Sequence, residues 1–418
     1  MTNPAFLRTL GALIAGSGAQ LAGSVASALV ATLLLPVEQR GLMVVVATIA
    51  AFVGLLGGAG AGNAYRRRHP TEPNPDRLAV EFTWLAVALV VISGLAGALS
   101  CLLMSTLADP RLGSWSYLIA TGLAASMQVL LLLVTDARFA LGHFMAGARW
   151  AAGVAAAGFA GVCVALAAGG DAALVVALQA GFQGAVLIGT ALAATRAGAL
   201  VWRRPSRARA GILLVEGLRS LVLPLAIVVV SRFDRLVLAV YDTTAAVAVY
   251  ALAATFVEIA RLAPIAIGQL TTREVATGAD WRAVRGRMLM AVVSAVVGGA
   301  ILIVVSFIVI PMWFGPAYAE APAVAVVLVG SEVISAVVLV GNLAIIGGGW
   351  SAQAIRIGVV AITIAIPAYV LGAVFGGMLG VAYARLVVFG VLAVLMWVVV
   401  RRRLTSSARE SHRPQGVR

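Results

Sequence analysis

The residues of this sequence best suited to chemistry are charged side chains inside long apolar segments. The apolar segment 211–239 carries charged residues toward both of its ends, namely Glu216, Arg219, Arg232, Asp234 and Arg235. A charged side chain at the centre of a membrane-spanning helix costs at least about 2.5 kcal/mol, so such residues usually face a water-filled cavity or a partner. We therefore interpret this segment as one wall of a transport cavity, with charge at both ends.

Two further apolar segments repeat this pattern. In segment 244–269, Glu258 and Arg261 share a helix face, and Pro264 follows about one turn later. Arg385 lies well inside the last apolar segment. A second interpretation stays open for the first two segments, because in both a Glu precedes an Arg by three residues, which is the spacing of a local ion pair on one helix.

Uncharged polar residues also recur at helical spacing. Gln20 and Ser24 belong to a polar stripe in the first apolar segment, which suits either a substrate contact or close packing of helices. In a later segment, Ser331 and Ser335 lie on one side with Glu332 beside them. For this second group we expect hydrogen bonds between helices rather than a ligand site.

No motif of an enzyme active site is present. The sequence contains no Walker phosphate loop, no Gly-x-Ser-x-Gly motif and no histidine-based metal cluster. The histidines lie in loops or in the C-terminal tail: His69, His143 and His412. The two cysteines, Cys101 and Cys163, lie in apolar segments without neighbours at metal-ligand spacing. We therefore expect no enzymatic activity, no metal site and no cofactor.

The elements that must position the charged residues are membrane-spanning helices. Hydrophobic residues make up 62% of the chain and charged residues only 11%, against about 25% charged residues in soluble domains. A bilayer-spanning helix needs about 20 apolar residues. Twelve segments approach or exceed that length: 9–35, 42–64, 78–106, 115–136, 146–168, 172–195, 211–239, 244–269, 288–312, 321–346, 357–375 and 378–400. The last two are divided by a glycine-rich turn at 376–380. The sequence thus predicts an all-α integral membrane protein of about twelve transmembrane helices.

The arginines alternate between the loops that join these segments. One set of loops is rich in arginine, as at 66–68, 196–209 and 273–287, and the opposite set holds few. Arginine-rich loops face the cytoplasm, so we expect a multi-pass protein with both termini in the cytoplasm. This pattern also explains the net charge of +14. We therefore expect no nucleic-acid partner.

Six predicted helices precede one basic segment at the middle of the chain, and six follow it. We expect an N-terminal six-helix bundle at 1–195, a basic cytoplasmic linker at 196–210, a C-terminal six-helix bundle at 211–400 and a basic cytoplasmic tail at 401–418. Two such bundles would face each other across a central cavity. Rocking of one bundle against the other would open that cavity to each side of the membrane in turn.

Three stretches of the sequence carry a family resemblance. The first has Pro36, Glu38 and Gly41, followed by the glycine-rich stretch 57–62. The second is FDRLVLAVYDTTAAVAVYALAATF at 233–256, and the third is WFGPAYAEAPAVAVVLVGSEV at 313–333. Together they resemble the Wzx-type polysaccharide flippases of the multidrug/oligosaccharidyl-lipid/polysaccharide (MOP) exporter superfamily, to which the MATE drug exporters also belong. The resemblance covers most of the chain.

The resemblance implies a flippase of the bacterial cytoplasmic membrane. Such a protein moves a polyprenyl-diphosphate-linked oligosaccharide, a precursor of cell-surface polysaccharide, from the inner to the outer leaflet by alternating access. A diphosphate is anionic, and arginine recognises phosphate through paired hydrogen bonds. The candidate substrate-binding residues are therefore Arg219, Arg261, Arg232, Arg235 and Arg385, with Gln20 and Ser24. The candidate residues for coupling to H⁺ or Na⁺ are Asp234, Glu258 and Glu216. The implied partners are the lipid-linked oligosaccharide, membrane lipids, and a polysaccharide polymerase or other envelope-assembly proteins.

Three other functions stay open. A MATE-like exporter of small molecules, coupled to H⁺ or Na⁺, would favour acidic cavity groups over basic ones. A membrane glycosyltransferase or polymerase usually needs a sizeable outer loop, and all loops predicted here are short. A scaffold for envelope assembly would carry intramembrane charges that pair with each other and that tolerate joint neutral replacement.

Overall fold

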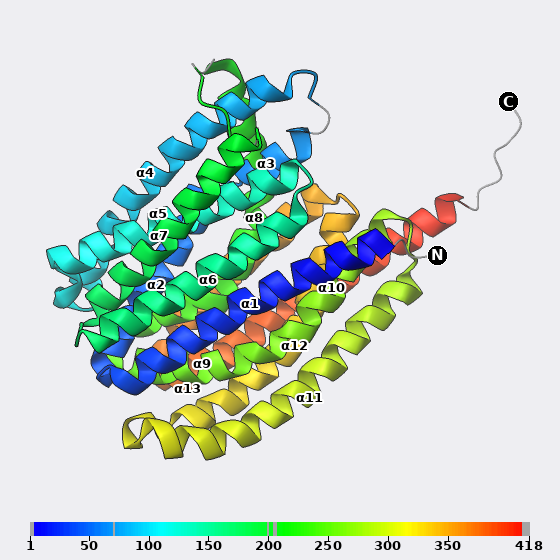
Figure 1. Ribbon diagram of the computed structural model, residues 1–418. Coiled ribbons are helices and arrows are strands. Elements are labelled where there is room, and N and C mark those ends of the chain that lie inside the picture. The colour runs from blue at the N-terminus through cyan, green and yellow to red at the C-terminus, as the bar shows by residue number, and fades with distance from the viewer. Residues whose placement is uncertain (1–3, 70–71, 199, 204–206, 412–418) are drawn as a thin grey trace, which may run out of the picture. The chain divides into compact units, whose positions relative to one another are not determined.

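All regular elements in the described part of the chain are helices (Figure 1). The computed structural model describes residues 4–411 except 70–71, 199 and 204–206. Within these residues, 10 helical stretches are long and apolar enough to cross a membrane. One of them contains both of the last two predicted spans, and the first predicted span lies on a further helix, α1 (Pro4–Leu34). The prediction of an all-α membrane protein with about twelve spans is confirmed.

The chain divides into two compact units. Unit 1 consists of Met1–Leu221 and Arg235–Leu252, and unit 2 consists of Val222–Asp234 and Ala253–Arg418. Helix α8 (Arg207–Tyr241) and helix α9 (Thr244–Glu258) each contribute residues to both units. The predicted division into bundles at 1–195 and 211–400 stays a prediction.

Unit 1 is built around one central helix, α5 (Trp115–Ala140). Besides α1 and parts of α8 and α9, its other elements are α2 (Val37–Gly57), α3 (Ala61–Arg68), α4 (Pro75–Leu107), η2 (Pro110–Gly113), α6 (Phe144–Ala167) and α7 (Ala172–Arg196). Helix α5 packs against α2, α3, α4 and α7, and α1 lies along α6 (Figure 1). Where α3 meets α4, Tyr65 stacks on Phe82 with 4.1 Å between ring centroids, and both rings are fully buried. This apolar core fixes the short helix α3 against the long helices.

The predicted span 42–64 is interrupted. Helix α2 ends at Gly57, and the turn that follows places Ala59 at φ 47° and Gly60 at φ 62°, in the left-handed region. A Cβ atom added to Gly60 would lie 2.2 Å from the carbonyl oxygen of Gly217, so only glycine fits there. The apolar pattern continues across this turn, which is why sequence periodicity predicted one continuous helix.

Unit 2 is organised around a different helix. Its elements besides parts of α8 and α9 are η3 (Ile259–Arg261), α10 (Leu262–Ala276), α11 (Trp281–Phe314), η4 (Pro316–Tyr318), α12 (Ala321–Gly347) and α13 (Ser351–Ser411). Helix α12 packs against α10, α11 and α13. The element α13 contains the last two predicted spans, divided at Gly377 by a non-helical conformation of φ 54° and ψ −137°. A Cβ atom on Gly380 would lie 2.0 Å from the carbonyl oxygen of Gly372, so the two arms approach each other closely beside the turn. The predicted glycine turn is confirmed.

The predicted span 244–269 contains a break of its own. Helix α9 ends at Glu258, and one turn of 3₁₀ helix follows before α10 begins at Leu262. Pro264 explains this break, because proline has no backbone N–H for the carbonyl of Ala260 and its ring crowds that carbonyl. The break places Arg261 at the junction of two helices.

Candidate functional site

The centre of unit 2 contains a buried arginine that binds two acidic side chains. Arg385, on the second arm of α13, is fully buried. Its Nη1 donates to Oδ2 of Asp234 at 3.0 Å, and its Nη2 donates to Oε1 of Glu332 at 2.7 Å. Asp234 and Glu332 are no more than 1% exposed. Buried charges require such pairing, because an isolated ion in an apolar interior is very costly.

A second arginine joins the same network through Glu332. Arg261 Nη2 donates to Glu332 Oε1 at 2.7 Å, and Arg261 Nε donates to Glu332 Oε2. The Ser335 hydroxyl lies 3.2 Å from Glu332 Oε2 and completes the set of donors around this carboxylate. Glu332 is therefore the shared partner of two guanidinium groups. Paired, charged hydrogen bonds of this fork geometry are among the stronger side-chain interactions in proteins.

Helix packing explains how residues so distant in sequence meet. The Tyr369 hydroxyl donates to the carbonyl of Val230, which fixes the unit 2 part of α8 against the first arm of α13. The turn at Gly377 then folds the second arm back, so that Arg385 reaches Asp234. The break before Pro264 supplies Arg261, and α12 supplies Glu332 from its middle.

The network alternates positive and negative groups. Two arginines, Arg261 and Arg385, bind two carboxylates, Asp234 and Glu332, and the charge of a third carboxylate, Glu258, also acts on Arg261. Arg385 is fully enclosed, whereas the Arg261 side chain is 19% exposed. Arg261 is thus the member of the network that a ligand could reach first. An anion would compete with Glu332 for Arg261, and a proton or Na⁺ would compete with the arginines for the carboxylates.

The structure therefore brings together three of the predicted site residues, Asp234, Arg261 and Arg385. Two other predicted residues of unit 2, Arg232 and Glu258, are half-buried, and the charge of Glu258 acts on Arg261, three residues further along the chain. Arg235 follows Asp234 directly but belongs to unit 1, where it is buried.

The remaining predicted site residues lie in unit 1. Glu216 binds Arg68 through both carboxylate oxygens, and Arg67 lies 3.2 Å from the same carboxylate. Arg219 is exposed, so the local Glu216–Arg219 pair that the spacing allowed is replaced by pairs with α3. The reason is that α3 ends in three consecutive arginines, which bring two guanidinium groups to α8.

The two polar residues predicted on α1, Gln20 and Ser24, are both exposed. Their spacing of four residues places them one turn apart on a single face of α1. The roles predicted for them stay predictions.

Sequence reasoning missed Glu332 as a site residue. Its serine neighbours suggested hydrogen bonds between helices, but the Ser331 and Ser335 hydroxyls instead bond within α12, to Leu328 and Glu332. The negative charge of Glu332 was the signal that could have identified it, because an acidic residue in the middle of an apolar span needs a cationic partner. Both partners, Arg261 and Arg385, were among the predicted residues.

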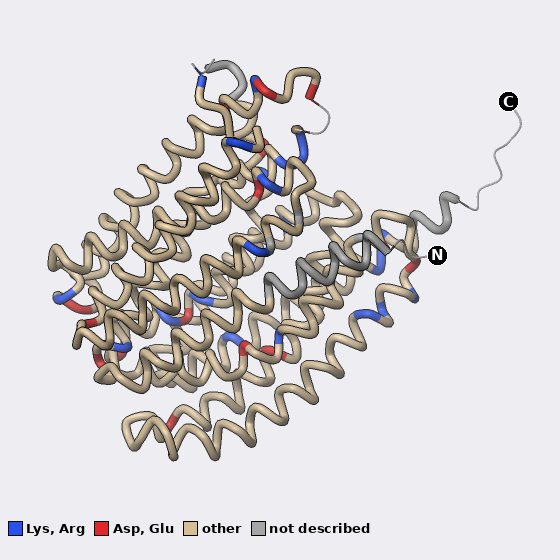
Figure 2. Tube along the Cα trace, viewed as in Figure 1, with Lys and Arg blue, Asp and Glu red and all other residues tan. Residues whose placement is uncertain are grey.

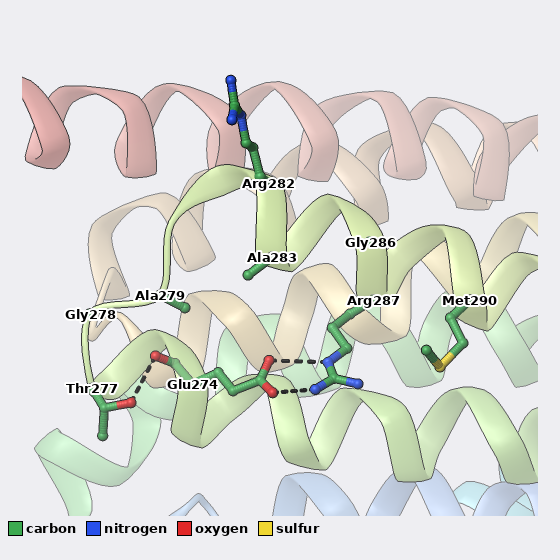
Figure 3. Close-up of a pocket in the computed structure, with 9 residues that line it drawn as sticks. All are labelled: Glu274, Thr277, Gly278, Ala279, Arg282, Ala283, Gly286, Arg287 and Met290. Carbon is green, nitrogen blue, oxygen red and sulfur yellow. Dashed lines mark hydrogen bonds and ion pairs between the residues drawn. The ribbon is translucent and has the colours of Figure 1, made fainter.

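Charged groups elsewhere lie mainly toward helix ends. Figure 2 shows long uncharged stretches along the helices, with acidic and basic residues gathered in small groups. One group lines a cavity of about 550 Å³ where α10 meets α11 (Figure 3). Glu274 and Arg287 form an ion pair along it, while the Arg282 side chain points away from that pair. None of the predicted site residues lines this cavity.

Comparisons with known proteins find structural relatives only. No family model and no curated protein matches the sequence. The chain is similar to an inward-facing structure of a multidrug resistance MATE family transporter of the MOP superfamily, at 15% identity and a TM-score of 0.67, covering 93% of this chain and 96% of that chain. It is also similar to an outward-facing structure of a multidrug resistance MATE family transporter, at 15% identity and a TM-score of 0.66, with 96% of both chains covered.

A third similar structure is a mutant of the MATE transporter VcmN from Vibrio cholerae, at 15% identity and a TM-score of 0.63, again covering 96% of both chains. These likenesses extend over nearly the whole chain in every case. The chain therefore has the fold of the MATE transporters of the MOP superfamily.

Proposed function

We propose that this protein is an alternating-access transporter of the cytoplasmic membrane. Two observations support the proposal. The fold is shared with transporters whose structures are described as inward-facing and outward-facing. Unit 2 also contains a buried charge network whose central carboxylate, Glu332, has two arginine partners. A shared partner allows charge pairs to exchange at low cost, which suits a protein that must occupy two conformations.

We further propose that the substrate is a polyprenyl-diphosphate-linked oligosaccharide, moved from the inner to the outer leaflet. The observation that carries this proposal is the paired contact of Arg261 with Glu332. A phosphate group offers two oxygens in the same fork arrangement as a carboxylate, so a diphosphate could take the place of Glu332 on Arg261. The partial exposure of Arg261 gives a substrate access to that contact.

In this proposal the acidic residues have a coupling role. When a diphosphate displaces Glu332 from Arg261, the Glu332 carboxylate loses a cation and takes up H⁺ or Na⁺ more readily. Asp234 is the second carboxylate that could do so, because Arg385 links it to Glu332. Substrate movement would thereby be linked to ion movement.

A MATE-like exporter of small molecules, coupled to H⁺ or Na⁺, is the second candidate. The specific observation that favours it is the number of acidic groups at the site, since Asp234 and Glu332 bind the two arginines and the charge of a third carboxylate, Glu258, also acts on Arg261. A cationic substrate would then compete with Arg261 for Glu332.

The experiment that separates the two candidates measures lipid-linked saccharides by mass spectrometry in a strain lacking the gene. An impermeant sugar-modifying reagent applied to spheroplasts reports the leaflet. Accumulation of one polyprenyl-diphosphate saccharide, protected on the inner leaflet, is the expected result. Accumulation on the outer leaflet would instead indicate a polymerising or ligating step. An unchanged lipid pool, in a strain shown to contain no second flippase, would rule out the oligosaccharide as substrate.

Complementation of that strain tests the site itself. The Arg261→Gln variant should fail to clear the accumulated lipid while the protein stays in the membrane. The matched control is Arg285→Gln, which removes an exposed arginine of α11. Full clearance by Arg261→Gln at wild-type protein level would remove Arg261 from the substrate site.

A further inference from the structure

Unit 1 contains an apolar groove on its surface, well removed in sequence from the charge network. Helices α4 and α7 both pack against α5 (Figure 1). A groove of about 360 Å³ lies along these three helices. Apolar side chains of all three helices line it, including Val87, Val91, Leu130, Leu133, Ile188 and Leu192. Val91, Ile188 and Leu192 are more than half exposed, so the groove opens to the lipid phase.

One end of the groove is closed by the segment that follows α7. Val201 N–H donates to the Thr83 hydroxyl at 3.0 Å, which ties this segment to α4. Trp202 Nε1 donates to the Thr195 hydroxyl at 3.3 Å, which ties it to α7. Trp84 Nε1 donates to the carbonyl of Arg203 at 2.7 Å. These bonds hold the groove end in a defined shape.

The two tryptophans place that end at the membrane interface. The Trp84 and Trp202 rings meet edge to face with 6.0 Å between their centroids, and both are about half exposed. Tryptophan concentrates at the level of the lipid headgroups, where an apolar ring and a polar N–H are both satisfied. The closed end of the groove therefore lies at headgroup level, and the apolar walls extend from there into the membrane.

The depth of the groove matches one leaflet. Its α4 wall extends from Phe82 to Val91. Nine residue steps of 1.5 Å correspond to about 14 Å, close to half of the roughly 30 Å hydrocarbon core. An acyl chain of one leaflet fits this depth, whereas a long polyprenyl tail would extend beyond it.

Positive charge lies at the same end. Arg196 directly follows Thr195, and Arg203 directly follows Trp202; both arginines are exposed. From these observations we propose that the groove binds one acyl chain of an anionic phospholipid, whose phosphate lies at Arg196 and Arg203. The positive-inside pattern assigns this lipid to the cytoplasmic leaflet. The proposal concerns a resident lipid and does not depend on which substrate the protein moves.

Native mass spectrometry of the full purified chain tests the site. The detergent-solubilised protein is titrated in turn with palmitoyl-oleoyl phosphatidylglycerol, with the matching phosphatidylcholine and with a polyprenyl phosphate. We expect phosphatidylglycerol to bind more tightly than phosphatidylcholine. The double variant Arg196→Gln/Arg203→Gln should weaken phosphatidylglycerol about 25-fold, from roughly fivefold per arginine at a lipid surface. The control is Arg285→Gln/Arg402→Gln, which removes two exposed arginines elsewhere and should change little.

Filling the groove tests the position of the acyl chain. Ala191 lines the groove, and the Ala191→Phe variant should abolish the bound phosphatidylglycerol. Ala300→Phe places the same ring on an exposed position of α11 and should bind lipid as the wild type does. If Ala191→Phe does not fold, Val87→Trp fills the same groove from α4.

Three results would overturn the proposal. Equal affinity for phosphatidylglycerol and phosphatidylcholine would show that the arginines select no headgroup. Undiminished phosphatidylglycerol binding by a folded groove-filling variant would show that the chain lies elsewhere. Preferential binding of the polyprenyl phosphate, lost when the groove is filled, would assign the groove to a polyprenyl lipid instead.

Discussion

Arg385 and Glu332 lie on neighbouring helices, α13 and α12, with 2.7 Å between the arginine Nη2 and the carboxylate Oε1. Both side chains are buried, and each has a second partner: Asp234 for the arginine and Arg261 for the carboxylate. The four residues form a linear chain of alternating charge across four elements. Glu332 holds the central position for both guanidinium groups, so the consequences of its removal should be the largest.

Neutral replacement of Glu332 should destabilise the protein strongly. In Glu332→Gln, two arginines retain only one carboxylate of the network, and an uncompensated buried charge typically costs 3–5 kcal/mol. We expect a clearly lower midpoint of thermal unfolding in detergent. Glu320→Gln, which changes an exposed acidic residue just before α12, should unfold like the wild type. Wild-type stability of Glu332→Gln would contradict the network as the structure shows it.

Arg385 and Asp234 should behave as a coupled pair. Arg385→Met alone leaves Asp234 buried with one partner fewer, and Asp234→Leu alone does the same to Arg385. The double variant removes both charges together, and joint replacement of a buried pair by apolar residues is often neutral or stabilising. A double-mutant cycle on unfolding free energies should give a coupling of about 1–3 kcal/mol. Simple additivity of the two single effects would disprove the coupling.

The stability that His69 contributes at the end of α3 should be lost in mild acid. Burial lowers the pKa of His69 below its ordinary value, and the nearby charge of Asp76 opposes this shift only in part. The unfolded chain therefore binds a proton more readily than the folded chain. Stability from this site is complete above about pH 6.5 and is lost as the pH falls below that value.

Thermal unfolding at pH 7.5 and 5.5 checks this expectation. The wild type should lose stability over this interval, and His69→Gln should lose less, because glutamine does not titrate. His143→Gln removes an exposed imidazole elsewhere and should respond to pH like the wild type. An identical response of the wild type and His69→Gln would contradict the assignment.

Gly41 should tolerate no side chain. A Cβ atom at this position would lie 1.8 Å from the carbonyl oxygen of Thr244, at the start of α9. Gly41→Ala must therefore move the backbone, and overpacking of this kind costs roughly 1–3 kcal/mol or more. Gly181→Ala on α7 meets no neighbouring atom and should be neutral or slightly stabilising, because alanine favours helix. Equal unfolding midpoints for the two variants would refute the close contact.

The helices were predictable because hydropathy is a local property. Every predicted span is largely helical, and the turn around Gly377 was expected from its glycines. The breaks at Gly57 and Glu258 were missed because apolar residues continue across them. Pro264 was the visible signal for the second break, since it removes a backbone donor where a helix needs one.

The charge network was only partly predictable for a related reason. Spacing along one helix suggested local pairs, yet Glu332 joins Arg385 and Arg261 from 53 and 71 residues away in the sequence. The position of a residue in the sequence does not indicate which distant charged residue will pair with a buried acid. The presence of charged residues inside apolar spans was the reliable signal for a buried site, because each such charge requires a partner.

The separation of Asp234 from Arg385 has a consequence for biosynthesis. The two residues are 151 positions apart, so the ribosome must add the whole of α9 to α12 before Arg385 exists. At ordinary rates of translation this interval is on the order of 10 s. During that time the nascent chain holds Asp234 and then Glu332 without the arginine that links them. The last hairpin is therefore the step that completes assembly, and truncation before it should leave a product that the membrane quality-control proteases recognise.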